Sequence, residues 1–179
     1  MLHPLGDRQR VELAGAMATV SRLLEASAIT VAIADPASPA VRTSMAAYFD
    51  ELARRFEAGF DPAVTLPTAD EQFRLPAGLV LLATLHDRPV GCVGLKLHAG
   101  GVGEVKRLWV SSEVRGLGLA RRMLGRIEAE GSSRGIHTLR LDTNRTLTEA
   151  IALYRALGYR EIEAYNGEPY AHRWFEKRI

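Results

Sequence analysis

One segment, residues 104–124, limits the possible folds more than any other part of the chain. Residues 104–110 have the composition of a strand, and a turn containing Gly116 and Gly118 follows them. Apolar residues at helical spacing then predict a helix over residues 116–130. The chain therefore passes from a strand through a glycine-bearing turn directly into an amphipathic helix.

The start of that helix predicts an anion site. The first backbone N–H groups of a helix have no partner within it, and they point to one spot at the positive end of the helix dipole. Arg115, Arg121 and Arg122 add positive charge, while Gly116 and Gly118 allow a close approach to the backbone. This combination suits a pyrophosphate group.

Two other nucleotide-binding motifs do not fit the segment. A Walker loop needs Gly-Lys-Ser/Thr after its glycines, and the sequence has none there. A dinucleotide-binding fingerprint needs a third glycine or alanine at the position of Arg121, within an alternating strand-helix chain. Here antiparallel strands are expected before the turn, so both motifs are set aside.

The remaining pattern predicts a single α/β domain whose sheet has about seven strands. The expected helices are 7–27, 38–57, 116–130 and 150–157, and the stretch up to Pro76 is expected to be a loop with a short helical turn. The expected strands are 29–34, 79–86, 90–98, 104–110, 138–143, 160–165 and 170–177.

Composition excludes several classes of protein. The chain has 179 residues and a net charge of only +2, which argues against a protein that binds nucleic acid through bulk charge. No apolar run approaches the ~20 residues of a membrane span, and residues 1–8 lack the pattern of a secretory signal. The single cysteine, Cys92, excludes an intramolecular disulfide and is expected to be buried. We therefore expect a cytoplasmic protein that binds neither nucleic acid nor membrane.

Two motifs, in order, resemble those of the GCN5-related N-acetyltransferase (GNAT) family. Residues 115–120 match the family's Gln/Arg-x-x-Gly-x-Gly/Ala pyrophosphate motif, and a frame starting at Glu113 indicates the same loop. Downstream, Asn144 and residues 149–159 resemble the family's Asn…Ala-x-x-Leu-Tyr-x-x-x-Gly-Phe/Tyr segment. The resemblance covers residues 29–179 and implies the GNAT fold, a mixed central sheet flanked by helices.

The resemblance implies acetyl-coenzyme A as co-substrate, bound between the strands at 104–110 and 138–143. By this comparison Leu108 and Val110 bind the pantetheine arm through their backbone, and Asn144 contacts the arm from the far side. A helix cap before residues 146–149, which look like a capping box, is the alternative role for Asn144. The implied cofactor-binding residues are Leu108, Trp109, Val110, Arg115, Gly116, Leu117, Gly118, Leu119, Ala120, Arg121, Asn144 and Tyr154.

Two residues are implied as catalytic. Tyr154 matches the family's tyrosine that protonates the coenzyme A sulfur, with packing of its ring on the sheet as the alternative. Glu104 lies where some members place the base that deprotonates the amine, and we expect burial to raise the pKa of its carboxyl. The alternative for Glu104 is an ion pair with Lys106 or Arg107.

The acceptor is expected to be the primary amine of a small molecule, an amino acid or a peptide, acetylated by direct transfer. Tyr165, Asn166 and Tyr170 are candidates for contacting it, and no cluster has metal-ligand spacing, so no metal is expected. The alternative is a non-catalytic acyl-coenzyme A sensor. Candidate partners for an acceptor carboxylate are Arg42, Arg54, Arg55 and Arg74.

Residues 1–28 fall outside the resemblance to acetyltransferases. Their apolar spacing resembles the last helix of winged-helix regulators of the multiple-antibiotic-resistance type, but the rest of such a regulator is absent. We therefore expect an accessory helix that packs on the domain or on a second subunit, which would form a homodimer.

Overall fold

The computed structural model describes residues 5–57, 59–65 and 70–179. Residues 1–4 of the expected accessory segment, and residues 66–69 of the expected loop before Pro76, lie outside the described part. No helix within the described ranges is long and apolar enough to cross a membrane.

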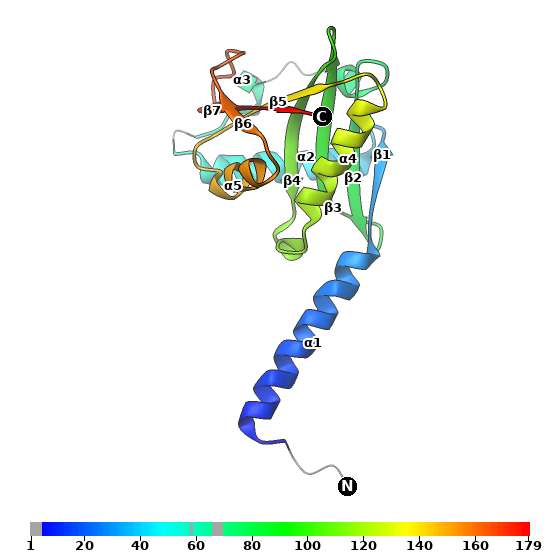
Figure 1. The fold of residues 1–179 in the computed structure, drawn as a ribbon, viewed down its shortest axis with the longest axis vertical. Helices are drawn as coiled ribbons and strands as arrows, with labels where there is room; N and C mark the ends of the chain where they lie inside the picture. Colours follow the sequence, from blue (N-terminus) through cyan, green and yellow to red (C-terminus); the bar gives the residue numbers. More distant parts are fainter. Residues whose placement is uncertain (1–4, 58, 66–69) are drawn as a thin grey trace.

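A mixed sheet with the strand order β1-β2-β3-β4-β5-β7-β6 forms the centre of the protein (Figure 1), as expected for the fold. Neighbouring strands are antiparallel except β4 and β5, which are parallel. The seven strands are β1 (Ile29–Ala34), β2 (Gly78–Leu85), β3 (Arg88–His98), β4 (Val102–Val110), β5 (Thr138–Thr143), β6 (Arg160–Ile162) and β7 (Arg173–Arg178).

Helices cover both faces of the sheet (Figure 1). The N-terminus of α2 is capped by Ser38, whose Oγ accepts a hydrogen bond from the N–H of Val41, with proline at the first helical position. The helices are α1 (Asp7–Ala28), α2 (Pro39–Arg55), α3 (Pro62–Thr65), α4 (Leu119–Ser132) and α5 (Thr148–Ala156), with short 3₁₀ turns η1 (Asp70–Phe73) and η2 (Ser112–Val114).

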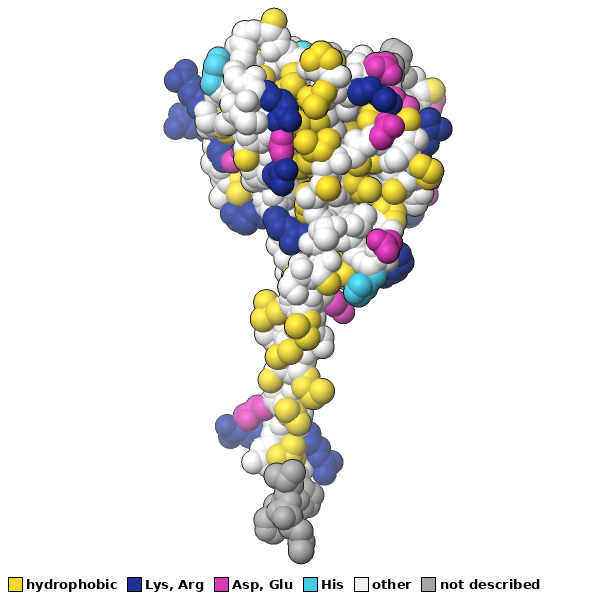
Figure 2. Space-filling model, turned by 90° about the vertical axis from the view of Figure 1, so that its right-hand side faces the viewer, with side chains coloured by type: hydrophobic (Ala, Val, Ile, Leu, Met, Phe, Trp, Pro, Cys, Tyr) yellow, Lys and Arg dark blue, Asp and Glu magenta, His cyan; other side chains and the backbone are white. Residues whose placement is uncertain are grey.

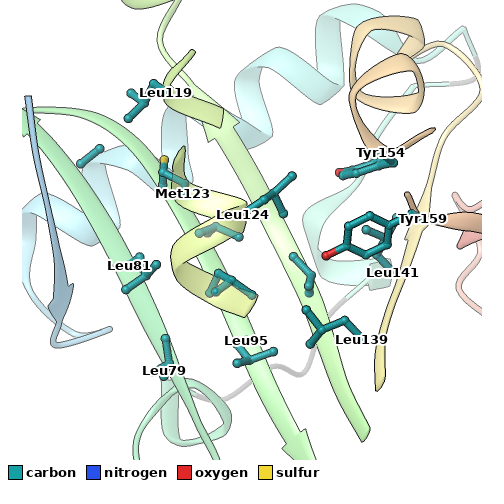
Figure 3. Close-up of a cluster of buried hydrophobic side chains, with 14 of the residues drawn as sticks. Leu79, Leu81, Leu95, Leu119, Met123, Leu124, Leu139, Leu141, Tyr154 and Tyr159 are labelled. Carbon is teal, nitrogen blue, oxygen red and sulfur yellow. The ribbon is translucent and has the colours of Figure 1, made fainter. Parts of the chain in front are cut away.

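Alternating side chains of β3 divide the core between the two faces. Val93 faces the larger cluster, in which Met123 and Leu124 of α4 pack on the sheet (Figure 3). Cys92 faces the smaller cluster under α2, together with Val41. The Cys92 side chain is completely buried, and burial raises the pKa of its thiol to about 12, so the expectation of a buried cysteine is confirmed.

Helix α1 projects away from the domain (Figure 1). None of its described residues is buried, and its apolar side chains form a yellow stripe along the projecting helix in Figure 2. The helix is as long as expected, but it does not pack on the domain. The exposed apolar residues of α1 are Val11, Leu13, Met17, Val20, Leu23 and Leu24. Leu13, Met17, Val20 and Leu24 share one face and form the stripe, whereas Val11 lies on the opposite side of the helix.

Three of the expected elements have clearly different bounds in the structure. Helix α4 begins at Leu119 rather than 116, because Gly116 and Gly118 have φ angles of +80° and +75°, outside the helical region. The last two strands are shorter than the expected 160–165 and 170–177. The residues between them leave the sheet and form a loop, 163–172, in which Tyr165 bonds to Glu104 of β4 and Asn166 bonds to Glu104 and to Asp142 of β5.

Candidate active site

The two parallel strands separate before they end. Pairing between β4 and β5 runs from Val102↔Thr138 to Glu104↔Arg140 and then stops, although β4 continues to Val110. The edge of β4 that faces β5 is therefore available to a ligand beyond Glu104. This opening lies between the two strands where the resemblance implies the cofactor arm.

A β-bulge lies within the free part of β4. Cys92 pairs with Trp109 and Gly94 pairs with Lys106, so two residues of β4, 107 and 108, oppose one residue of β3. Arg107 takes a φ of +58°, which is uncommon for a residue with a side chain. Its guanidinium lies 4.9 Å from the centre of the Phe73 ring and 5.7 Å from that of Phe49.

The turn between β4 and α4 has the geometry of an anion site. Gly118 is the N-cap of α4, and the first bond of the helix runs from the N–H of Arg122 to the carbonyl of Gly118. The N–H groups at 119–121 precede that bond and have no acceptor within the helix. A Cβ built on Gly116 or Gly118 meets no atom within 4 Å, so space is open around both glycines.

A cleft of about 530 Å³ runs from this turn along β4 to α5. The cleft fits an elongated anionic cofactor, because the free edge of β4, apolar side chains and the N-terminus of α4 all border it. Leu117 instead packs against the core, while Asn144 and Tyr154 line a neighbouring cavity. The expected cofactor-binding residues that line the cleft are Leu108, Trp109, Val110, Arg115, Gly116, Gly118, Leu119, Ala120 and Arg121.

Of the three arginines expected at the turn, two line the cleft and one does not. Arg121 and Arg115 line the cleft, but Arg115 forms an ion pair at 2.5 Å with Glu51 of α2 and donates to the carbonyl of Val110 at 3.1 Å. Arg122 points away and donates to the carbonyl of Ile29 at 2.8 Å. The expectation that Arg122 adds charge at the turn is therefore wrong, since the end of α1 supplies acceptors for it.

A second cavity, of about 340 Å³, adjoins the cleft and shares Leu108 and Ala150 with it. One wall is aromatic: the ring centres of Phe60 and Tyr170 are 5.1 Å apart, and those of Phe56 and Tyr170 are 5.7 Å apart. The lining also contains a charged group of side chains. The charged lining residues are Lys96, Glu104, Lys106, Arg107, Asp142 and Glu168.

Tyr154 lines this second cavity. It lies on α5, its ring packs 5.9 Å from that of Tyr159 and 5.8 Å from that of Phe175, and its hydroxyl end faces β4 (Figure 3). Burial, followed by the charge of Asp142, raises the pKa of its hydroxyl. The hydroxyl therefore keeps its proton over the whole physiological range.

Glu104 is held by several partners at once. Its carboxylate pairs with Lys106 at 3.1 Å and accepts hydrogen bonds from Tyr165 at 3.1 Å and Asn166 at 3.3 Å, with His98 Nε2 3.4 Å away. Burial alone would raise the pKa of this carboxyl, but the charge and hydrogen bond of Lys106 outweigh it and lower the pKa. The expected raised pKa is wrong, and the alternative ion pair with Lys106 is present.

Asn144 fixes the loop 163–172 over the cavity. It is buried, and its Nδ2 donates to the carbonyl of Tyr170 at 2.9 Å, while its Oδ1 accepts from the N–H and hydroxyl of Thr146 at 3.0 Å. The cap of α5 is Leu147, with no side-chain cap bond, so the alternative capping box at 146–149 does not form. A contact between Asn144 and the cofactor stays a prediction.

The expected acceptor residues divide into two groups. Asn166 and Tyr170 line the second cavity, whereas Tyr165 bonds to Glu104 from outside the lining. None of the four arginines proposed for an acceptor carboxylate lines it. Arg42 pairs with Asp70, Arg74 with Asp35, and Arg55 with Glu51 and Glu149, while Arg54 lies in a separate surface hollow.

Sequence reasoning named Glu104, Lys106 and Arg107 but missed the other charged lining residues, Lys96, Asp142 and Glu168. Lys106 bridges Glu104 and Asp142 in one network, and Asp142 is brought there because β4 and β5 run side by side. Alternation along the two strands could have indicated this pair. The position of Glu168 depends on how the loop 163–172 folds back, for which the sequence gives no signal. Within the described ranges, no group of three His, Cys, Asp or Glu side chains is placed to hold a metal ion.

The chain is similar to known acetyltransferases in sequence and in fold. Residues 45–159 match the family model described as Acetyltransferase (GNAT) family. An "IAA acetyltransferase" of Azospirillum brasilense is 40% identical over 80 residues, which cover 44% of this chain and 52% of that protein. The chain thus spans about half the length of that curated relative.

Solved structures agree on the fold. An acetyltransferase of the GNAT family from Staphylococcus aureus superposes with a TM-score of 0.72 at 18% identity, covering 84% of this chain and 99% of that one. A GNAT family acetyltransferase from Elizabethkingia anophelis, with acetyl-CoA bound, gives a TM-score of 0.60 at 14% identity, covering 85% and 99%.

Proposed function

Because the chain belongs to the acetyltransferase (GNAT) family, we propose that it transfers an acetyl group from acetyl-coenzyme A directly to a primary amine. The observation that carries this proposal is the junction of two cavities. The cleft that starts at the glycine turn of α4 meets the cavity that contains Tyr154, where β4 and β5 separate. When bound, acetyl-coenzyme A supplies an acetyl group already activated as a thioester.

In this proposal the turn and the edge of β4 bind the cofactor. The N–H groups at 119–121 and the side chain of Arg121 receive the pyrophosphate, and the backbone of Leu108 and Val110 pairs with the pantetheine amides. The free edge of β4 beyond Glu104 supports the second contact, since its N–H and C=O groups have no strand on the β5 side.

Tyr154 donates the proton that the departing sulfur needs. Its raised pKa supports this role, because the hydroxyl is protonated whenever a substrate arrives. Glu104 orders the cavity through Lys106 and Tyr165, and its lowered pKa makes it a weak base. Cys92 is fully buried in the core under α2 and lines neither cavity, which favours direct transfer over an acetyl-cysteine intermediate.

The proposal also includes a homodimer formed through α1. The apolar stripe of α1, from Leu13 to Leu24, is exposed, with 61% of Met17 and 64% of Leu24 accessible. A stripe of this length is unusual on a helix that meets no partner, and a second copy carries the same stripe.

Calorimetry of acetyl-coenzyme A binding tests the cofactor site. The change is Gly118→Ala, which places a methyl group where the pyrophosphate approaches and strains a backbone at φ +75°. The matched control is Gly135→Ala, at φ +80° and also with open space around its Cβ, but remote from the cleft. We expect at least ~10-fold weaker binding in Gly118→Ala alone. Equal affinities in the two folded variants would remove this site.

A further inference from the structure

Glu168 lines the second cavity, and within the described residues one of its carboxyl oxygens lacks the hydrogen bonds that its acidic neighbours make. It lies in the loop 163–172, and its Oε1 is enclosed without a hydrogen-bond partner among the described residues. An enclosed carboxyl oxygen without a donor costs free energy unless a ligand supplies one. The other two acidic groups of the cavity, Glu104 and Asp142, are both bonded to Lys106.

The backbone on either side of Glu168 is fixed. The N–H of Ala171 donates to the carbonyl of Glu168 at 3.1 Å, and the N–H of His172 donates to the carbonyl of Thr143 at 2.9 Å. Asn144 holds the carbonyl of Tyr170 from the other side. The loop therefore presents Glu168 to the cavity from an anchored position, as a binding site requires.

The electrostatic surroundings make Glu168 the stronger base. Burial is the largest influence on its carboxyl and raises the pKa, while two charged neighbours lower the pKa and two raise it. By contrast, the pKa of Glu104 is lowered. The charged groups that act on Glu168 are Lys96 of β3, Glu104 and Lys106 of β4, and Asp142 of β5.

We propose that Glu168 binds the ammonium group of the acceptor and takes its proton, and that the acceptor carries an apolar group about the size of a benzene ring. The first part rests on the unpartnered oxygen and on the anchored loop. The second rests on the aromatic wall of Phe56, Phe60 and Tyr170 in the same cavity. The inference deepens the proposed function and depends on it for the transfer step.

The protons and bonds balance as follows. The acceptor's ammonium gives one proton to the Glu168 carboxylate, and the neutral nitrogen forms a bond to the acetyl carbon as the carbon–sulfur bond breaks. The sulfur takes a proton from the Tyr154 hydroxyl, and the second proton of the new amide nitrogen restores that hydroxyl. Glu168 then releases its proton to solvent, which accounts for the one proton produced in each turnover.

The pH dependence of kcat/KM with phenethylamine as acceptor tests the base. In the wild type we expect a plateau above the pKa of Glu168. In Glu168→Gln we expect kcat/KM to be ~10²-fold lower near pH 7 and to rise about tenfold per pH unit, as the free amine itself loses its proton. Glu104→Gln should keep the plateau. Profiles of the same shape for Glu168→Gln and the wild type would overturn the proposal.

Calorimetry of phenethylamine with the protein alone gives a readout that needs no turnover. Loss of a charge-assisted hydrogen bond should weaken binding about tenfold or more in Glu168→Gln, and not in the exposed loop variant Glu163→Gln. Equal affinity in Glu168→Gln, or no binding to the wild type, overturns the amine site. Wild-type protein that binds phenethylamine through Glu168 but never acetylates it would support the site and contradict the proposed transferase activity.

Discussion

Replacement of Tyr154 by phenylalanine separates its chemistry from its packing. The Tyr154 side chain is only 6% exposed, and its ring contacts are with the rings of Tyr159 and Phe175. Phenylalanine keeps those contacts and removes only the hydroxyl that lies at the cavity. The variant should therefore fold as the wild type does, with a stability change of about 1 kcal/mol or less.

The expected kinetic effect follows from the role of the hydroxyl. General acids contribute roughly 10²–10⁴-fold to a rate. Because burial raises the pKa of Tyr154, the group is a reluctant donor, and we expect the lower end, ~10²-fold in kcat. This is about 2.7 kcal/mol in the activation barrier. Cofactor affinity should stay close to that of the wild type, since the pyrophosphate turn is untouched.

Steady-state kinetics and calorimetry on the same preparations measure the two effects. Tyr159→Phe is the matched control, because it makes the same chemical change in the neighbouring ring, which lines neither cavity. We expect kcat to fall only in Tyr154→Phe. Full activity in Tyr154→Phe, or an equal fall in both variants, would refute the assignment of the proton donor.

Two further predictions concern the helix α1 and the core. Removal of residues 1–25 keeps Ala26 and its hydrogen bond with Arg122, and it should convert a dimer into a monomer in sedimentation if α1 forms the dimer. It should leave the unfolding temperature of the domain nearly unchanged, because no described residue of α1 is buried. The same number of copies in the full and shortened proteins would contradict a homodimer through α1. Leu124→Ala, at a completely buried position of α4, should lower the free energy of unfolding by ~2–5 kcal/mol in urea titrations, whereas Leu24→Ala on α1 should change it by less than about 0.5 kcal/mol in a protein kept monomeric.

The elements that sequence predicts well are those fixed by local patterns. The strands around the turn at His86 and Asp87 and the helix capped by Ser38 have their signals within a few residues. The last two strands are shorter than the sequence predicts, because distant contacts decide where they end. Tyr165 and Asn166 bond to Glu104, more than sixty positions earlier, and this pulls the chain out of the sheet.

The candidate site also has one part that a local pattern predicts and another part that distant contacts bring together. The glycine turn is recognisable in the sequence because one continuous segment forms it. Burial predicts a raised pKa for Glu104, but the alternative ion pair with Lys106 is present, and the ammonium 3.1 Å away on the same strand lowers the pKa. Glu168 and Tyr170 come from the loop 163–172, whereas Phe56 and Phe60 of the aromatic wall lie far earlier in the chain, and no spacing in the sequence brings the two parts together.

Helix α1 continues into β1 without a linker, since the helix ends at Ala28 and the strand begins at Ile29. Arg122, four residues after the glycine that caps α4, donates to the carbonyls of Ala26 and Ile29 across this junction. The helix has 22 residues and is therefore about 33 Å long. A lever of that length turns a 5° rotation at the junction into a displacement of roughly 3 Å at its tip, by the same helix geometry. Conversely, a partner that holds the tip of α1 sets the orientation of the edge strand β1. Through the guanidinium of Arg122 it also acts on the first turn of α4, which faces the cofactor cleft.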